Sequence, residues 1–228
     1  MEKKQSVIKI AEFLKENYNI DNFQLPEEYN YSCLPLCILD AIFSIGVNYK
    51  SVENVVSRFC EKNSIEKYGT QKQEYTISEF CRYIESIGID SFKNDILQNR
   101  QLTSSISGIP KAEAVYQVAD LFKNNGIETK SDFNTKLTDE IESEYKNIKG
   151  QTSGISLNYL KMLAGCDDLV KPDRHIMNFL IQEYGFDISK PCQAQTIIDD
   201  VTNELKKEFK DITQRKVDYM IWKYMSSK

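Results

Sequence analysis

A turn between two predicted helices and an aspartate one helix later are the parts of this chain best suited to chemistry. The turn spans residues 148–156 (Ile-Lys-Gly-Gln-Thr-Ser-Gly-Ile-Ser), and the aspartate is Asp173. A turn that opens directly into a helix points backbone N–H groups outward at the positive helix end, where they bind anions such as a DNA phosphate. The residues expected to contact the phosphate, three of them with a hydroxyl donor as well, are Gly150, Thr152, Ser153, Gly154 and Ser156.

Asp173 has two compatible roles at its position. It follows Pro172 and precedes a stretch with helical periodicity, so composition alone favours an N-cap, which contributes about 1 kcal/mol. The second role is chemical, because a carboxylate lies near the phosphate-binding turn in sequence. A capping carboxylate faces the positive helix end and stays ionised. It would therefore stabilise a cationic sugar better than it would remove a proton.

Helical periodicity dominates the rest of the chain and predicts an all-α fold. Glycine (9) and proline (5) are scarce for 228 residues, and 41% hydrophobic residues allow a packed core. The segment from Leu34 to Ile45 is apolar nearly all round, which predicts the central helix of a bundle. Further helices are expected at 51–59, 78–87, 94–101, 110–126, 131–145, 156–164, 173–185, 193–209 and 213–225.

The charge distribution bears on a possible DNA partner. The net charge is −5, with 29 basic and 34 acidic residues, which argues against a general polyanion binder. Residues 128–144 hold six acids and two lysines and are expected to form one solvated acidic helix. A local basic surface can still bind DNA. The basic residues expected to form it are Lys146, Lys149, Lys161, Lys171 and Arg174.

Cysteine spacing and apolar runs predict no metal centre and no membrane span. The six cysteines form no Cys-x-x-Cys pair and no zinc or iron–sulfur pattern, so we expect buried thiols in a reduced cytoplasm. No apolar run approaches the roughly 18 residues of a spanning helix. The start, Met1-Glu-Lys-Lys, leads into an amphipathic stretch and predicts no signal sequence.

Two segments together resemble the signature of the endonuclease III superfamily of DNA glycosylases. In that family a Leu-Pro-Gly-x-Gly hairpin is followed, one helix later, by Asp-x-His and a hydrophobic residue; here these are 148–150 (Ile-Lys-Gly) and 173–176 (Asp-Arg-His-Ile). The second segment is also similar to that of archaeal-type 8-oxoguanine glycosylases. Residues 108–115 resemble the family's Lys-Ala-x-x-Ile helix start, and 44–52 resemble the segment that lines its base pocket. The resemblance spans roughly residues 31–185.

The resemblance implies a fold and a reaction. The fold is two-lobed and helical, with residues 1–30 and 166–228 in one lobe, 31–165 in the other, and a cleft between them. A nucleotide is flipped into the cleft because the glycosidic bond is unreachable in a stacked duplex. Asp173 then stabilises the oxocarbenium-like sugar and orients water, as in a hydrolase of base-excision DNA repair. The residues expected to line the base pocket are Asp40, Asn48, Tyr49, Lys111 and Tyr159.

Three departures from the family pattern narrow the expected activity. The lysine that attacks the sugar in bifunctional members falls on Gly154, or on Ser153 if the register slips, and neither is an amine. A monofunctional glycosylase follows. The position of the family's second hairpin glycine is occupied here by Thr152. Only Cys192 follows Asp173, so we expect no iron–sulfur cluster and no other cofactor, with a monovalent cation at the hairpin left open.

Several single residues have competing interpretations. Asp40 is either a satisfied buried acid or a base-reading group. Lys111, unfavourable at a helix N-terminus, is either solvated or a phosphate or pocket ligand. We expect His175 to bond within its lobe and Trp222 to lie in the core. The family's gap-filling glutamine falls near Gly46, with Asn48 or Tyr49 as alternatives; the best candidates for stacking on a base are Tyr31, Tyr49 and Tyr159.

Two other functions remain open. The altered hairpin and the net charge of −5 are compatible with a non-catalytic DNA-binding protein in a repair or defence complex. A helical protein without a nucleic-acid partner is the third possibility, and it would lack salt-sensitive DNA binding. We expect a monomer in the cytoplasm, associated with the nucleoid. The sequence specifies neither the base nor a preference for single- or double-stranded DNA.

Overall fold

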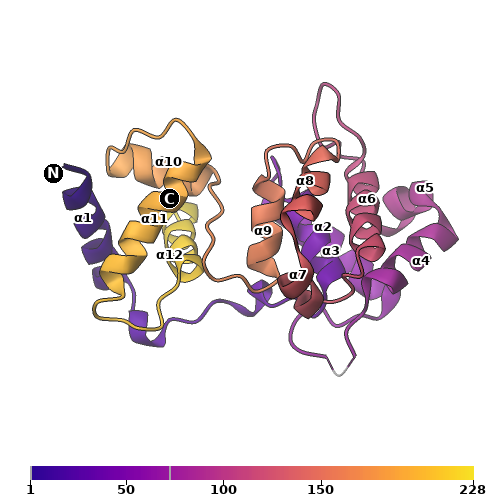
Figure 1. Ribbon diagram of the computed structural model, residues 1–228, viewed down its shortest axis with the longest axis horizontal. Coiled ribbons are helices and arrows are strands. Elements are labelled where there is room, and N and C mark those ends of the chain that lie inside the picture. The colour runs from indigo at the N-terminus through magenta and orange to yellow at the C-terminus, as the bar shows by residue number, and fades with distance from the viewer. Residues whose placement is uncertain (1, 72) are drawn as a thin grey trace. The chain divides into compact units, whose positions relative to one another are not determined.

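The protein is helical throughout the part of the chain that the structure describes. The computed structural model describes residues 2–71 and 73–228, and among these residues only two isolated β-bridges, Tyr31 with Tyr68 and Leu102 with Pro110, interrupt the helices and loops (Figure 1). The all-α class is therefore confirmed. The chain divides into two compact units: unit 1 is Met1–Pro26 with Cys166–Lys228, and unit 2 is Glu27–Gly165. The boundaries expected from the sequence were 30/31 and 165/166.

Unit 2 is built around helix α2 (Leu34–Phe43), whose ten residues are all buried. Helices α3 (Tyr49–Asn63), α6 (Lys111–Asn124) and α9 (Ile155–Leu163) pack directly on it. Helix α4 (Ile77–Ile87) packs on α6, and α5 (Ile89–Ser91) leads into a π-helical turn, Phe92–Ile96. The central position predicted for the apolar 34–45 segment follows from this complete burial.

The acidic stretch of unit 2 forms two helices rather than the single one expected over 131–145. Helix α7 (Lys130–Lys136) ends where Leu137 turns extended, and α8 (Asp139–Asn147) begins after Thr138. The break arises because the Thr138 hydroxyl accepts the N–H of Ile141, so that a new cap outcompetes helix continuation. The two helices bury one face, which includes Phe133 of α7 and Ile141 and Tyr145 of α8.

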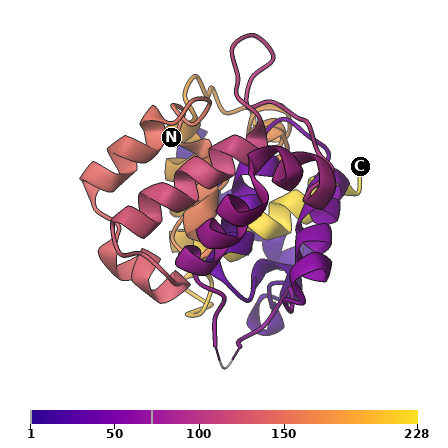
Figure 2. The ribbon, with the colours of Figure 1, turned by 90° about the vertical axis from the view of Figure 1, so that its right-hand side faces the viewer.

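The helix expected over 94–101 differs from the structure, in which the helical residues begin and end earlier. The helical residues of this region are α5 and the following π-turn, and residues 98–101 are extended or irregular. From Leu102 to Pro110 the chain makes a narrow loop that stands away from the helices of unit 2 (Figure 2). It is closed by the bond from the Thr103 N–H to the Ile109 carbonyl, 2.9 Å.

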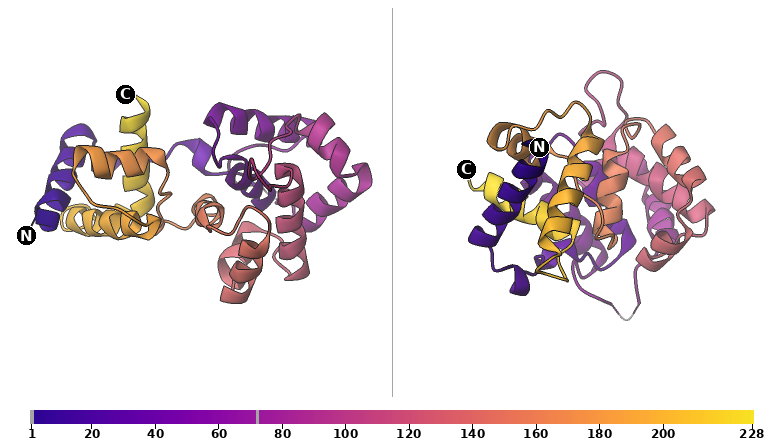
Figure 3. Two further views of the ribbon diagram at one scale, coloured as in Figure 1. Left: turned by 90° about the horizontal axis from the view of Figure 1, so that it is seen from above. Right: turned by 60° about the vertical axis from the view of Figure 1, so that its left-hand side comes forward.

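Unit 1 joins the two ends of the chain around its own core. Helix α1 (Glu2–Asn17) packs on α11 (Pro191–Leu205), and α12 (Gln214–Ser226) packs on both α11 and α10 (Arg174–Asn178), as Figure 3 shows. Helix α10 passes into a π-helical turn, Phe179–Glu183, within the single helix expected over 173–185. The core draws on all four helices, including Ile10, Leu14, Phe179, Ile198, Val201, Val217 and Ile221.

In the residues that the structure describes, no helix combines the length and the apolar character needed to cross a membrane.

Candidate functional site

In unit 2, two consecutive reverse turns connect α8 to α9; residues 148–154 are called the α8–α9 turn. The Gln151 N–H bonds the Ile148 carbonyl at 2.9 Å, and the Gly154 N–H bonds the Gln151 carbonyl at 3.0 Å. Gly150 (φ +92°) and Gly154 (φ +70°) occupy left-handed backbone conformations that favour glycine. Gly154 is also the N-cap of α9, so the chain enters that helix directly from the turn.

The environments of these two glycines differ. A side-chain carbon on Gly150 would overlap the Cβ and Oγ1 atoms of Thr103, because the 102–110 loop lies against the turn there. At Gly154 the same carbon would lie 3.2 Å from Cε of Lys146, whose side chain runs past the start of α9. The space requirement is therefore strict at Gly150, whereas at Gly154 the flexible end of a lysine side chain can move aside.

The expected phosphate ligands do not all present their side chains. Thr152 and Ser153 are exposed, but Ser156 is 1% exposed. The Ser156 hydroxyl donates to Oε1 of Gln151 at 2.5 Å and accepts from the Tyr145 hydroxyl at 3.0 Å. The expectation of a hydroxyl donor at Ser156 is wrong, because two buried polar side chains need it as a partner.

The basic residues expected to form one surface are distributed over both units. Lys146 and Lys149 are exposed at the α8–α9 turn, whereas Lys161 pairs with Glu142 at 2.5 Å and links α9 to α8. Lys171 and Arg174 belong to unit 1. The cations at the turn are thus Lys146 and Lys149.

In unit 1, Asp173 caps helix α10. Its Oδ1 accepts the N–H groups of His175 at 2.8 Å and Ile176 at 3.1 Å. The expected N-cap is confirmed. The side chain is only partly buried, and Asp173 also donates its own N–H to the Lys171 carbonyl at 2.7 Å.

A second carboxyl group, on Asp218 of α12, lies close to Asp173. Asp218 is 5% exposed, and its Oδ1 accepts the Lys171 N–H at 3.1 Å. Burial, and then the negative charge of Asp173, raise the pKa of Asp218 well above its usual value. Asp218 was not among the residues expected from the sequence. The available signal was an aspartate next to Val217 and one turn before the apolar Ile221 and Trp222.

Aromatic rings from α12 extend this region. The Trp222 ring lies edge-on to His175, with centroids 6.2 Å apart, and stacks on Tyr219 at 5.8 Å. Trp222 is half-buried, so the prediction of a core position is wrong; Tyr219 shares its exposed side of the helix. His175, as expected, interacts within its own unit.

The residues expected to line a base pocket separate into one cluster and two isolated positions. In unit 2, Oδ2 of Asp40 accepts three tyrosine hydroxyls: Tyr31 at 2.9 Å, Tyr49 at 3.4 Å and Tyr159 at 3.5 Å. Burial, and next the charge of Asp40, raise the pKa of Tyr31 and of Tyr49 far above the usual value. Asp40 is therefore a buried acid with hydrogen bonds at Oδ2, and its reading of a base stays a prediction. Tyr31 and Tyr159 are themselves buried, so only Tyr49 offers an accessible ring.

Lys111 lies outside this cluster and is neither solvated nor at a surface. Its Nζ donates to the carbonyls of Phe43 (2.9 Å) and Ile45 (2.8 Å) at the end of α2, and the residue is 2% exposed. Burial lowers its pKa to about 8. The expectation of a solvated lysine is wrong, because the carbonyls at the negative end of α2 require a donor.

Asn48 is exposed, and its side chain caps α3 by accepting the Lys50 N–H at 2.9 Å. Asn48 therefore supports a helix start, and no bond in the described residues joins it to the Asp40 cluster.

The sequence analysis also did not identify two exposed apolar side chains on the 102–110 loop. Ile106 is 96% exposed and Leu102 48%. Thr103 of the loop lies close against Gly150 of the α8–α9 turn. No periodicity marks an isolated exposed isoleucine, so the sequence offered no signal for it.

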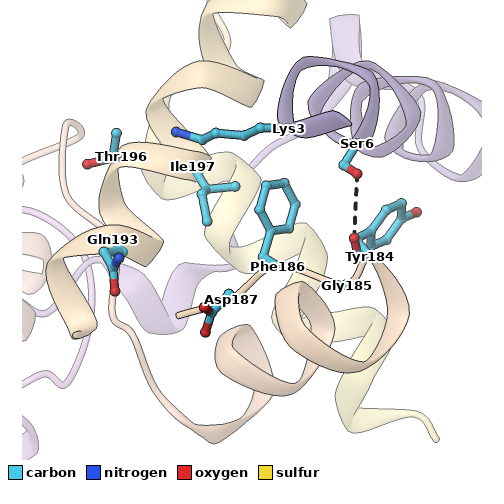
Figure 4. Close-up of a pocket in the computed structure, with 9 residues that line it drawn as sticks. All are labelled: Lys3, Ser6, Tyr184, Gly185, Phe186, Asp187, Gln193, Thr196 and Ile197. Carbon is cyan, nitrogen blue, oxygen red and sulfur yellow. Dashed lines mark hydrogen bonds between the residues drawn. The ribbon is translucent and has the colours of Figure 1, made fainter. Parts of the chain in front are cut away.

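Figure 4 shows a pocket of about 570 Å³ in unit 1, between α1, residues 184–187 and α11. Two of its polar side chains already have partners: Gln193 accepts the N–H groups of Ser189 and Lys190, and Lys3 pairs with Asp200 at 3.4 Å.

Across residues 2–71 and 73–228, no three His, Cys, Asp or Glu side chains are grouped to hold a metal ion. Four cysteines are buried as expected, but Cys166 is half-buried and Cys192 exposed, so the expectation of buried thiols fails for these two.

Neither the curated proteins nor the solved structures contain a match to this chain. The family model that does match is described as a domain of unknown function, DUF8548, and it covers residues 8–226. The match spans nearly the whole chain, and the protein therefore belongs to the DUF8548 family.

Proposed function

We propose that this protein is a monofunctional DNA N-glycosylase with a two-lobed helical fold and a helix-hairpin-helix motif at the α8–α9 turn. The turn binds a phosphate of the DNA backbone, and Asp173 acts on the sugar of a flipped nucleotide. The bond from C1′ to the base nitrogen breaks and its electron pair leaves with the base. Asp173 stabilises the positive charge left on the sugar, water adds to C1′, and its released proton balances the departing base.

The observation that carries the proposal is the environment of Asp173. Its carboxylate is fixed by two backbone N–H groups, at 2.8 and 3.1 Å, and remains partly exposed. The partly exposed Trp222 ring lies edge-on to His175, two residues after Asp173, and offers an aromatic surface to a base. A fixed, partly exposed carboxylate suits a reaction that develops positive charge on a sugar.

The α8–α9 turn supports the DNA-binding part of the proposal. Exposed residues precede α9 on the chain: Lys146 at the end of α8, and Lys149, Thr152 and Ser153 in the turn. The first N–H groups of a helix lack partners within the helix and bind phosphate. Ser156 contributes to this through its backbone position alone.

Ile106 supplies a group that can fill the space of a flipped base. It is 96% exposed on a loop whose Thr103 lies close against Gly150 of the α8–α9 turn. Apolar side chains of this kind insert between base steps in proteins that distort DNA. We therefore assign this role to Ile106 in place of Gly46, Asn48 or Tyr49.

The experiment is base release from duplexes that each carry one damaged or modified base, followed as abasic sites. We expect release from at least one substrate, and we expect Asp173→Asn to abolish it while the affinity for that DNA stays within about twofold. Unaltered release by Asp173→Asn would overturn the mechanism. Tight, salt-sensitive DNA binding without any abasic product would instead favour the non-catalytic DNA-binding function.

A further inference from the structure

We propose that Asp218 is the positioning residue of Asp173 and that it acts as a neutral carboxylic acid, so that the two side chains together carry one negative charge. The inference rests on the proposed function only for the catalytic role of Asp173. The charge state of the pair can be measured without any activity.

A short chain of hydrogen bonds links the two residues. Oδ1 of Asp218 accepts the Lys171 N–H at 3.1 Å, and the Lys171 carbonyl accepts the Asp173 N–H at 2.7 Å. Asp218 thus holds the peptide segment from which Asp173 enters α10. Asp173 has an extended backbone (φ −79°, ψ −178°), which directs its carboxylate back over the N–H groups of His175 and Ile176.

The surroundings of Asp218 determine which of the two carboxyl groups keeps the proton. Asp218 is 5% exposed, whereas Asp173 is partly open to water and stabilised by two N–H donors. The charged groups that act on Asp218 are Asp173 at the start of α10, Lys171 in the preceding loop and Arg215 on its own helix. Arg215 also pairs with Asp167, with 3.5 Å between Nη1 of Arg215 and Oδ1 of Asp167.

Burial and the charge of Asp173 raise the pKa of Asp218, and the Lys171 N–H, Lys171 and Arg215 only partly oppose this rise. Two neighbouring carboxyl groups that differ in burial separate in this way, and the more buried one stays protonated. Because Asp218 keeps the proton, Asp173 is the charged member of the pair.

The charge state has a defined effect on stability. The folded state keeps a proton on Asp218 at pH values where the unfolded chain has lost it, above about pH 4. The group's contribution is fully present below that pH and is lost as the pH rises toward the raised folded-state pKa. Over this window each unit rise in pH lowers the folding equilibrium constant by up to about tenfold, because the folded state holds one more proton than the unfolded chain.

The first test compares unfolding by urea from pH 4 to pH 9 in wild type, Asp218→Asn and Asp200→Asn. Asp200 is a control because it lies exposed on unit 1 and pairs only at the surface with Lys3. In wild type the unfolding free energy should fall with pH by an amount that corresponds to up to one proton. We expect Asp218→Asn to remove this pH dependence and Asp200→Asn to leave it unchanged. In Asp173→Asn the window should end at a lower pH, because the neighbouring charge is gone. Equal linkage in wild type and Asp218→Asn would overturn the proposal.

The second test compares base release by Asp218→Ala and Asp218→Asn. Alanine leaves the Lys171 N–H without its acceptor, so we expect at least about a tenfold lower kcat, whereas the affinity for DNA changes less than about twofold. Asp218→Asn resembles the neutral acid, so we expect it to keep most of the wild-type kcat. Because asparagine does not ionise, the kcat of this variant should also not decline at alkaline pH. Equal defects in both variants, or none in either, would overturn the positioning role. If wild type releases no base, the proposed function fails and the linkage measurement alone decides the proposal.

Discussion

Gly150 lies against Thr103, so that any side chain at position 150 would overlap the Cβ and Oγ1 atoms of that threonine. The contact joins the α8–α9 turn to the 102–110 loop, two segments of unit 2 that are far apart in sequence. It also gives Gly150 two separate requirements, since its φ of +92° is itself disfavoured for other residues.

Gly150→Ala should therefore destabilise unit 2 more than a change at a glycine that has only the backbone requirement. Gly126 is the matched control, because its φ is +66° and a Cβ at that position would meet open space. We expect a loss of about 3 kcal/mol in unfolding free energy for Gly150→Ala and about 1 kcal/mol for Gly126→Ala, by urea denaturation. Equal losses would show that the contact with Thr103 is unimportant.

Lys111 gives a prediction about pH because it is buried at the end of α2 and its pKa is lowered to about 8. Between about pH 8 and the ordinary lysine value near 10.4, the unfolded chain binds more protons than the folded one. Its contribution to stability should therefore rise with pH in this window and stay constant below it. The neutral amine still has protons to donate to the carbonyls of Phe43 and Ile45.

Lys111→Met provides the measurement. It leaves both carbonyls without this donor, so we expect a loss of about 2 kcal/mol at pH 7 that becomes larger from pH 8 to pH 10. Lys123→Met, at an exposed ion pair with Glu85, should show no such growth with pH. A constant difference between wild type and Lys111→Met across that range would contradict the prediction.

Ile106 should matter for DNA and not for folding. Its side chain is 96% exposed, so Ile106→Ser should leave the unfolding free energy within about 0.5 kcal/mol. If it inserts into the base stack, the serine variant should release base about tenfold more slowly, equivalent to about 1.4 kcal/mol of lost burial. Ile106→Leu should retain the activity. Equal rates for the serine variant and wild type would exclude insertion.

The sequence allowed the helices and the capping role of Asp173 to be predicted, because both depend on local patterns. The apolar 34–45 segment and the Pro172-Asp173 start are set by neighbours within one helical turn. The break between α7 and α8 was missed because Thr138 competes as a cap within an otherwise continuous acidic pattern.

Residues whose environment comes from distant segments could not be predicted in this way. Lys111 was expected to be solvated or to contact a phosphate or the base pocket, because periodicity does not show that its amine lies beside the end of α2, 66 to 68 residues away in sequence. Ser156 was assigned as a phosphate donor because the sequence does not reveal that Tyr145 and Gln151 bond its hydroxyl. Asp218 became significant only through its bond to Lys171, 47 residues earlier.

Two exposed lysines, Lys146 at the end of α8 and Lys149 in the α8–α9 turn, provide the most direct test of the phosphate site. If Lys146 and Lys149 each neutralise a DNA phosphate, replacing either with alanine should reduce the slope of log Kd against log salt by about 1. Lys161 is the matched control, because its ammonium already pairs with Glu142 at 2.5 Å and releases no DNA counterion. Lys161→Ala should leave the slope unchanged even if it lowers stability slightly. Equal slopes for all three variants and wild type would place the phosphate contacts elsewhere, since a cation that binds DNA cannot be removed without changing the counterions released.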